Sequence, residues 1–309
     1  DGAEGTFGFS TNVVTDPANA SPFELMDDDT KTISNVIANL DVNNPYQVSE
    51  DAVNSGFDLT DIDCSASDVL NDPTINLDNN RVDFTIGVGE TLECTFTNTL
   101  RRGKILVDKV TVPGGSTQSF VFSTNFGADF NLTDSDSPYD SGPLLPSTYS
   151  VSEIGPPGWD LTSATCDDGS DPSAIDLAPG ETVTCEFNNE QDANIIVEKQ
   201  TDPDGSGQLF DFTTDYGAPF QLSDGQTNDS GALDPGTYSV TETVPAGWEL
   251  KTATCTDGSD PSAISLQAGE TVTCTFNNEQ DANIIVEKQT DPSDSPQLFT
   301  FSTSYRYLL

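Results

Sequence analysis

Six cysteines are the residues of this 309-residue chain whose type and spacing most clearly indicate covalent chemistry. They form three successive pairs, and an even number of cysteines in an exported, strand-rich chain predicts disulfides. A zinc site is a poor alternative, because no pair has Cys-x-x-Cys spacing and the chain contains no histidine. Each predicted bridge closes a loop of about 20 to 30 residues and contributes about 3 kcal/mol. The predicted disulfides are Cys64–Cys94, Cys166–Cys185 and Cys255–Cys274.

The absence of histidine also argues against an enzyme. No Ser-His or Cys-His nucleophile pair can be built, and the predicted disulfides take up the cysteines. With 52 acidic residues, two carboxylates close together do not indicate a glycosidase. No Gly-rich loop precedes a helix, so a nucleotide site has no support either. We therefore expect no turnover of an external substrate and no cofactor.

Charge and hydropathy narrow the partners and the location. The net charge is −42, and nucleic acid or anionic membranes would need clustered Lys and Arg. Membrane insertion is not expected, because no apolar run reaches the roughly 18 residues that span a bilayer. The N-terminus carries no charged-then-apolar leader, so we expect any leader to have been removed. An acidic surface is typical of high-salt habitats and also of secreted proteins, and we expect an extracellular, cell-surface location.

Short alternating apolar runs joined by turn residues predict an all-β chain. Examples are "TYSVTE" at Thr237–Glu242 and "TVTCTF" at Thr271–Phe276, and the chain holds 24 Gly and 19 Pro. No segment of ten or more residues has a helical period.

The chain is also an internal repeat. Residues 236–280 match residues 147–191 at a constant offset of 89, and a more divergent copy is visible from Tyr46 and Gly89. Copies of about 90 residues are each large enough for a β-sandwich core. The predicted domains are a divergent β-sandwich over 1–100, two β-sandwiches over 101–190 and 191–280, and an orphan strand segment over 281–309.

Three motifs carry a resemblance to a known family. They are "TYSVTETVPAGW" at Thr237–Trp248, "IIVEK" at Ile195–Lys199 and "TFNN" at Thr275–Asn278. The first is similar to the E-box, Y-x-L-x-E-x-x-A-P-x-G-Y, of the prealbumin-like domains of surface proteins and pilins, also called collagen-adhesin B-type or SpaA-type. The resemblance covers Lys104 to Gln280 well and Asp1 to Thr99 more loosely. It implies Ig-like or prealbumin-like β-sandwiches, some of which form a spontaneous Lys–Asn isopeptide bond assisted by the Glu.

Strand periodicity agrees with this implication. Because side chains alternate along a strand, the Lys, Glu and Asn of these motifs each share a face with two apolar residues and should point into the core. Burial favours a neutral, nucleophilic amine and a protonated carboxyl that can shuttle protons. The resulting candidate sets are Lys109, Glu153, Asn189 and Lys199, Glu242, Asn278.

The placement of lysine supports these sets without settling the chemistry. The chain has six lysines, and Lys109, Lys199 and Lys288 occupy the same strand position. A buried Lys–Glu ion pair, or a lysine that reaches solvent at the strand end, would give the same pattern. The sequence also departs from the family, since Trp248 replaces the usual Tyr and a disulfide already ties the last strand.

The two ends of the sequence have complementary features. Aligning Asp1 with Asp204 places the start of the first repeat just after its expected Lys-bearing strand, so we expect this domain to lack its N-terminal strand. Residues 283–292, "NIIVEKQTDP", repeat that strand with no domain of their own. Donation of this strand to another chain would complete the sheet and build a fibre. Lys288 would then enter a core that contains Glu50 and Asn98.

Two observations leave an alternative open. The tail "QLFTFSTSYRYLL" would duplicate a strand that the acceptor already has at Thr6–Thr11, and Arg306–Leu309 no longer match the repeat sequence. The 309 residues could equally be a piece of a longer tandem protein.

Smaller motifs have plain explanations beside functional ones. Asn19, Asn131 and Asn228 stand in N-x-S/T sequons, a number near chance in a Ser/Thr-rich chain. Acidic turns at Asp134 and Asp167 could bind Ca²⁺ weakly, but neither has EF-hand spacing, and solvated turns explain them as well. Trp159 and Trp248 recur at matched places and indicate packing rather than ligand binding.

The function expected from the sequence is structural. We expect an extracellular filament or pilus-like subunit that assembles with copies of itself, head to tail, by strand donation. The alternative is the stalk or tip of a longer adhesin that binds a surface ligand or glycan.

Overall fold

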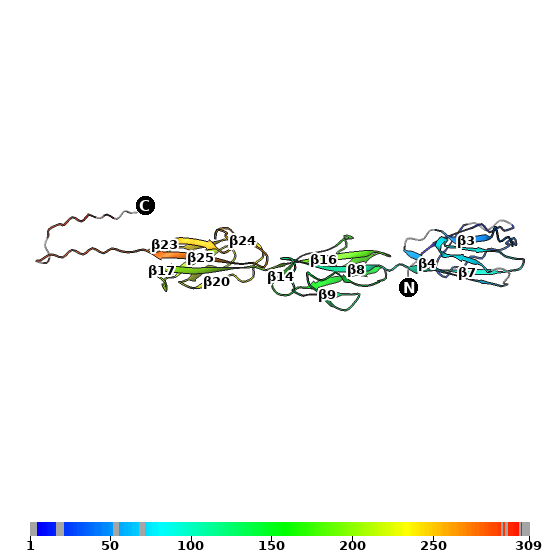
Figure 1. The fold of residues 1–309 in the computed structure, drawn as a ribbon, viewed down its shortest axis with the longest axis horizontal. Coiled ribbons are helices and arrows are strands. Elements are labelled where there is room, and N and C mark those ends of the chain that lie inside the picture. Colours follow the sequence, from blue (N-terminus) through cyan, green and yellow to red (C-terminus); the bar gives the residue numbers. More distant parts are fainter. Residues whose placement is uncertain are drawn as a thin grey trace. The chain divides into compact units, whose positions relative to one another are not determined.

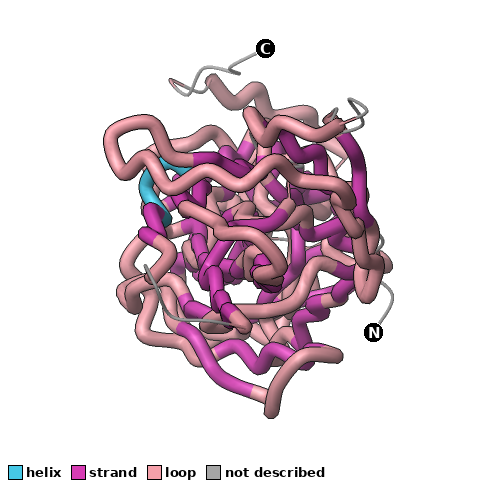
Figure 2. Tube along the Cα trace, turned by 90° about the vertical axis from the view of Figure 1, so that its right-hand side faces the viewer, coloured by secondary structure: helices cyan, strands magenta, loops and turns pink. Residues whose placement is uncertain are grey.

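Strands make up nearly all regular structure in the computed structural model. It describes residues 5–16, 22–51, 56–67, 72–291, 293, 296–302 and 304. These residues form 25 strands and one 3-10 turn at Leu77–Asn79 (Figure 2). The all-β fold predicted from the sequence is confirmed.

The first repeat has a five-stranded sheet and a two-stranded sheet. The larger has the order β2-β1-β3-β6-β5, and the smaller pairs β4 with β7. The strands are β1 (Phe7–Thr11), β2 (Phe23–Leu25), β3 (Tyr46–Glu50), β4 (Phe57–Ala66), β5 (Thr74–Asn76), β6 (Arg81–Phe84) and β7 (Leu92–Leu100).

The second repeat has a four-stranded sheet in the order β11-β8-β16-β14, with smaller sheets β10-β9-β13 and β12-β15. Its strands are β8 (Lys104–Val112), β9 (Phe120–Thr124), β10 (Phe130–Leu132), β11 (Tyr139–Asp140), β12 (Ser147–Tyr149), β13 (Val151–Ile154), β14 (Trp159–Cys166), β15 (Ile175–Leu177) and β16 (Thr182–Gln191).

Residues 193–309 form a separate unit that holds the third repeat. Its sheets repeat the pattern of the second: β20-β17-β25-β23, β19-β18-β22 and β21-β24. The strands are β17 (Asn194–Asp202), β18 (Phe210–Thr214), β19 (Phe220–Leu222), β20 (Thr227–Asp229), β21 (Gly236–Tyr238), β22 (Val240–Thr243), β23 (Trp248–Cys255), β24 (Ile264–Leu266) and β25 (Thr271–Gln280).

Alternation along the strands builds each core. In β8 every second residue from Ile105 onward is buried, and that row includes Lys109. Phe120, Phe122 and Phe187 fill the space between the sheets. Trp159 packs edge-on against Phe120 at 5.4 Å, and the matching ring pair in the third repeat is 5.3 Å apart, so both tryptophans have a packing role.

The stretch "TYSVTE", expected as one strand, is broken at Ser239. β21 pairs with β24, whereas β22 pairs with β18 in another sheet. The Asp215 carboxylate accepts a hydrogen bond from the Ser239 N–H at 2.9 Å, which satisfies the backbone where the chain crosses between sheets. The single-strand prediction was therefore wrong here.

The last strand of each repeat differs in its neighbours. β16 lies between antiparallel β14 and parallel β8, and β25 lies between β23 and β17 in the same way. Within the described residues β7 pairs with β4 alone. Leu92, Cys94 and Phe96 are only half-buried there. Their counterparts in β16, at residues 183, 185 and 187, are at most 2% exposed.

The segment after β25 contains the repeated strand sequence but no strand. Residues 281–291 have no regular structure, and Figure 1 draws no arrow beyond β25. Ile284 is 74% and Val286 63% exposed, whereas their counterparts in β17, Ile195 and Val197, are fully buried. Residues 283–291 therefore have the sequence of a core-forming strand but are exposed to solvent.

Candidate functional site

Lys109, Glu153 and Asn189 meet in the core of the second repeat. β8 and β16 run parallel with Lys109 opposite Phe187, so the lysine side chain can reach Asn189 two residues further along. Lys109 Nζ donates to Asn189 Oδ1 at 2.7 Å, and Asn189 Nδ2 donates to Glu153 Oε1 at 2.6 Å. Glu153, from β13 in a facing sheet, also lies 3.7 Å from Lys109 Nζ. An amine, a carboxamide and a carboxyl group are thus in contact.

The third repeat places the same three residue types together. Lys199 Nζ donates to Asn278 Oδ1 at 2.8 Å and lies 3.7 Å from Glu242 Oε1. The Lys199 and Glu242 side chains are both 0% exposed. Neither Glu242 carboxyl oxygen nor Asn278 Nδ2 has a hydrogen-bond partner among the described residues. The carboxyl group here is therefore bound less tightly than in the second repeat.

Burial shifts both ionisable groups toward their neutral forms. It lowers the pKa of Lys109 and Lys199, and the nearby glutamates oppose that shift. It raises the pKa of Glu153 and Glu242 against the opposing lysines. Neutral amine and protonated carboxyl are the forms that amide chemistry requires.

Sequence reasoning missed several contacts of the two lysines. Lys109 Nζ also donates to the carbonyls of Val110 and Phe187, and it lies 4.3 Å from the centre of the Phe120 ring. Three neutral oxygens, from Asn189 and two backbone carbonyls, accept from the three donors of an ammonium group. Glu153 Oε2 lies 3.7 Å from the amine and has no hydrogen-bond partner among the described residues, so the carboxyl group faces the lysine as an ion-pair partner only. The aromatic contact recurs as Lys199 over Phe210, and its sequence signal is the matched "SFVF" and "LFDF" segments.

The first repeat holds two of the three groups. Asn98 Nδ2 donates to Glu50 Oε1 at 2.9 Å, and Glu50 is 4% exposed. Burial raises the pKa of Glu50, while the Asn98 hydrogen bond opposes the shift. Glu50 Oε2 and Asn98 Oδ1 are buried without a hydrogen-bond partner in the part of the chain that the structure describes. In the other two repeats the lysine donates to the equivalent amide oxygen, whereas the carboxyl oxygen nearest the lysine has no hydrogen-bond partner among the described residues there either. We call Glu50 and Asn98 the half-site.

Lys288, the third lysine of the series, lies in the segment after β25 and outside any such set. Its amine contacts the Gln289 carbonyl and the Phe299 ring, 4.4 Å from the ring centre.

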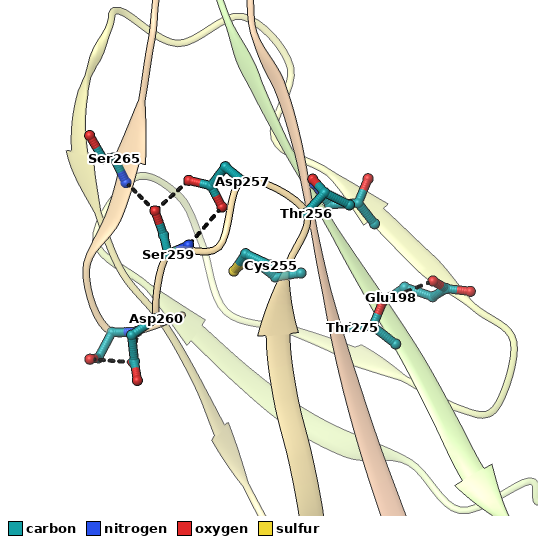
Figure 3. Close-up of a disulfide and its surroundings, with 11 residues drawn as sticks. Glu198, Cys255, Thr256, Asp257, Ser259, Asp260, Ser265 and Thr275 are labelled. Atoms are coloured by element: carbon teal, nitrogen blue, oxygen red, sulfur yellow. Dashed lines mark hydrogen bonds between the residues drawn. A yellow bond between two sulfur atoms is a disulfide. The ribbon is translucent and has the colours of Figure 1, made fainter.

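Each predicted cysteine pair is joined between the last strand of its repeat and that strand's antiparallel neighbour. The disulfides are Cys64–Cys94, Cys166–Cys185 and Cys255–Cys274. In Figure 3 the turn after Cys255 is closed by side chains: the Ser259 N–H donates to Asp257 at 3.1 Å, and Ser259 Oγ accepts from the Ser265 N–H.

The acidic turns proposed as Ca²⁺ sites use their oxygens within the fold. Asp134 accepts backbone N–H groups from Thr111 and Gly115, and Asp167 accepts the Thr184 N–H at 2.8 Å. These bonds give the carboxylates a structural role.

Two of the three sequon asparagines lie among the described residues. Asn131 in β10 is exposed, Asn228 in β20 is half-buried, and Asn19 lies outside the described residues.

No helix in the described part of the chain is long and apolar enough to cross a bilayer.

Tandem β-sandwich domains, two of which hold a buried Lys–Glu–Asn set, define the class of this protein. A family model described as a prealbumin-like fold domain matches residues 1–100, 105–191 and 195–280. The chain belongs to the prealbumin-like fold domain family, and the resemblance drawn from its motifs is confirmed.

The chain was also compared with individual proteins. A search of curated proteins gave no match. Similar solved structures include the TIE protein of Bacillus anthracis, with 17% identity and a TM-score of 0.30 over 91% of this chain and 52% of that one. A major pilin (T-13) of Streptococcus pyogenes has 15% identity and a TM-score of 0.28 over 59% and 98%. The pilus adhesin SpaC of Lactobacillus rhamnosus GG has 14% identity and a TM-score of 0.26 over 93% and 42%. The chain thus spans about half the length of the TIE protein and less of SpaC.

Proposed function

We propose that this chain is an extracellular structural protein of the pilus type, whose second and third repeats lock themselves by isopeptide bonds. The observation that carries the proposal is the buried contact of amine, carboxamide and carboxyl groups, built twice from matched residues. Tandem domains and one disulfide per domain suit an exported, load-bearing chain.

The reaction needs no external reagent. Lys109 transfers a proton to Glu153, and the neutral Nζ attacks Asn189 Cγ. The Nζ–Cγ bond forms, the Cγ–Nδ2 bond breaks, and Glu153 carries a proton from the attacking amine to the departing nitrogen. Ammonia leaves, and one amide replaces another.

We also propose that the chains assemble head to tail, the segment after β25 adding to the open edge of β7 in another chain. Three features support this. Among the described residues β7 has one strand neighbour, and its inward-facing side chains are half-buried. Residues 283–291 have the sequence of the strand that covers the equivalent side chains in the third repeat. Added strands of this kind supply backbone hydrogen bonds and core side chains together.

One experiment tests both proposals: purified chain is measured for native size across concentrations and for intact mass after reduction and denaturation. We expect a mass lower by two ammonia per chain, and size growing with concentration. Val286→Asp should abolish the growth, since it puts a charge on the core-facing row. Ile285→Asp is the matched control, because its counterpart Ile196 faces away from the core.

Each proposal has its own contradicting result. The full sequence mass would refute the bonds and leave buried ion pairs. A chain that stays monomeric, or equal loss of assembly in both tail variants, would refute strand donation.

A further inference from the structure

We infer that the third repeat binds an uncharged pyranose unit of a glycan, in a cavity bounded by the ends of β18 and β19 and by β20. This site lies apart from the Lys–Glu–Asn set and does not depend on isopeptide bonds or on strand donation. The cavity has a volume of about 200 Å³. Its walls include Thr214, Tyr216, Phe220, Asn228 and Asp229.

A difference between two otherwise matched repeats accounts for this cavity. The segment "YDSG" at residues 139–142 corresponds to "NDSG" at residues 228–231. Tyr139 and Asn228 pair with the same valine position of the first strand, so they are structurally equivalent. A phenol ring in the second repeat is therefore replaced by a smaller carboxamide in the third.

Aromatic stacking shows which surface this replacement leaves uncovered. In the second repeat the Tyr139 ring stacks on Phe130, with ring centres 3.6 Å apart. In the third, the matching Phe220 stacks on buried Phe212 at 5.4 Å, and Asn228 has the position of the outer ring. Phe220 is half-buried and lines the cavity. Its ring is thus available to a flat, apolar surface.

The space beyond the ring differs in the same way. In the second repeat Tyr139 Oη lies 3.6 Å from the point where a side chain on Gly127 would start. At the matching Gly217 the nearest atom is Thr214 Oγ1 at 3.7 Å, and no described atom of β20 comes within 4 Å. Tyr139 therefore fills in the second repeat the space that the cavity occupies in the third.

The remaining walls of the cavity are polar. Thr214, Asn228 and Asp229 contribute a hydroxyl, a carboxamide and a carboxylate. The Tyr216 hydroxyl is buried without a hydrogen-bond partner among the described residues, and its counterpart Phe126 has no hydroxyl. Burial raises the pKa of Tyr216 to about 12, so the hydroxyl keeps its proton at neutral pH. An unpaired buried hydroxyl costs free energy, which a ligand hydroxyl beside it would recover.

A pyranose unit matches this combination of walls. One face of its ring presents C–H groups that pack on an aromatic ring, and its hydroxyl groups both donate and accept hydrogen bonds. An aromatic side chain of a partner protein would stack as well, but it would leave the carboxamide and the carboxylate without partners. The net charge of −42 disfavours an anionic sugar.

The test uses the full chain produced without N-glycosylation, because Asn228 is also a sequon asparagine. Saturation-transfer NMR measures the binding of methyl glycosides of glucose, galactose, mannose and N-acetylglucosamine, with p-cresol as the probe for an aromatic side chain. We expect at least one glycoside to bind, with the strongest saturation at the C–H protons of one ring face.

Asn228→Tyr gives the third repeat the residue of the second and should weaken this binding at least about tenfold, because the ring fills the cavity. The stack of Tyr139 on Phe130 shows that the fold accepts the ring, so the variant should keep its melting temperature. Thr227→Tyr is the matched control. It adds the same ring one residue away, at an exposed position outside the cavity walls, and should leave binding unchanged.

Three results would overturn the inference. One is that none of the four glycosides binds. Binding of p-cresol alone would assign the cavity to an aromatic side chain of a partner protein. Glycoside binding that persists in Asn228→Tyr would place the sugar elsewhere on the chain.

Discussion

The buried glutamates of the three repeats have different neighbours, and these neighbours decide how each glutamate affects the stability of its repeat. Glu153 and Glu242 lie 3.7 Å from a lysine amine. Among the described residues, the Glu50 carboxyl group has a hydrogen bond from Asn98 and no nearby lysine. Removing one member of a buried pair leaves an uncompensated charge, whereas neutralising a lone buried carboxylate removes a cost. The same Glu→Gln substitution should therefore destabilise the second repeat and stabilise the first.

Glu153→Gln should lower the free energy of unfolding of the second repeat by about 3–5 kcal/mol, because the variant cannot form the proposed bond and leaves the unreacted Lys109 ammonium buried without its anion. Glu50→Gln should raise that of the first by about 1 kcal/mol, since the new amide can donate to Asn98 Oδ1. Hydrogen exchange read by mass spectrometry reports each repeat separately. Equal responses would contradict the difference in environment.

The effect of Glu50 should depend on pH. Because its pKa is raised in the folded state, its contribution is full below its unfolded pKa of about 4.3 and is lost as pH rises through the folded value. The gain from Glu50→Gln should thus appear at neutral pH and vanish near pH 4.

In the part of the chain that the structure describes, β7 has no parallel neighbour, and this distinguishes the first repeat from the other two. Where β8 or β17 covers the last strand, the disulfide is buried: Cys185 and Cys274 are 0% exposed. Cys64 and Cys94 are half-buried. Thiolate attack needs access to sulfur, so this difference should control the rate of reduction.

We expect Cys64–Cys94 to be reduced first when a thiol reductant is added to the native chain. Timed alkylation followed by peptide mass spectrometry gives the order. A peptide of residues 283–292 should slow this reduction by covering Cys94. Reduction of all three disulfides at one rate, with or without peptide, would count against an open edge.

The charge of −42 acts on assembly as a whole, because every chain repels every other. Screening reaches about 30 Å at 0.01 M salt and about 10 Å at 0.1 M. Docking one strand into one edge must overcome that repulsion before short-range contacts form.

The rate of chain association should therefore rise with ionic strength. Light scattering after dilution into 0.01 to 1 M salt measures it. Ile285→Lys adds a positive charge on the outward side of the tail and so makes its net charge less negative. This variant should raise the association rate most at low salt. A rate that falls with salt would indicate attraction between opposite charges instead.

Much of this organisation follows from local pattern. Alternation in "IIVEK" and "TFNN" places Lys199 and Asn278 inward, and the repeats pair the cysteines. The break at Ser239 could not be predicted, because it depends on Asp215, just after β18, accepting a hydrogen bond from the Ser239 backbone. The unpartnered atoms of the half-site depend likewise on which strands meet. Periodicity gives the direction of a side chain, and only tertiary contacts give its partners.

Parallel pairing of first and last strands determines how a repeat carries tension. The chain enters the second repeat at the start of β8 and leaves at the end of β16, so a pull on both ends slides these strands past each other. All hydrogen bonds between them then bear load together, rather than opening one at a time. With the proposed bond from Lys109 to Asn189, the force crosses directly between positions 80 residues apart, and the residues between them stay slack.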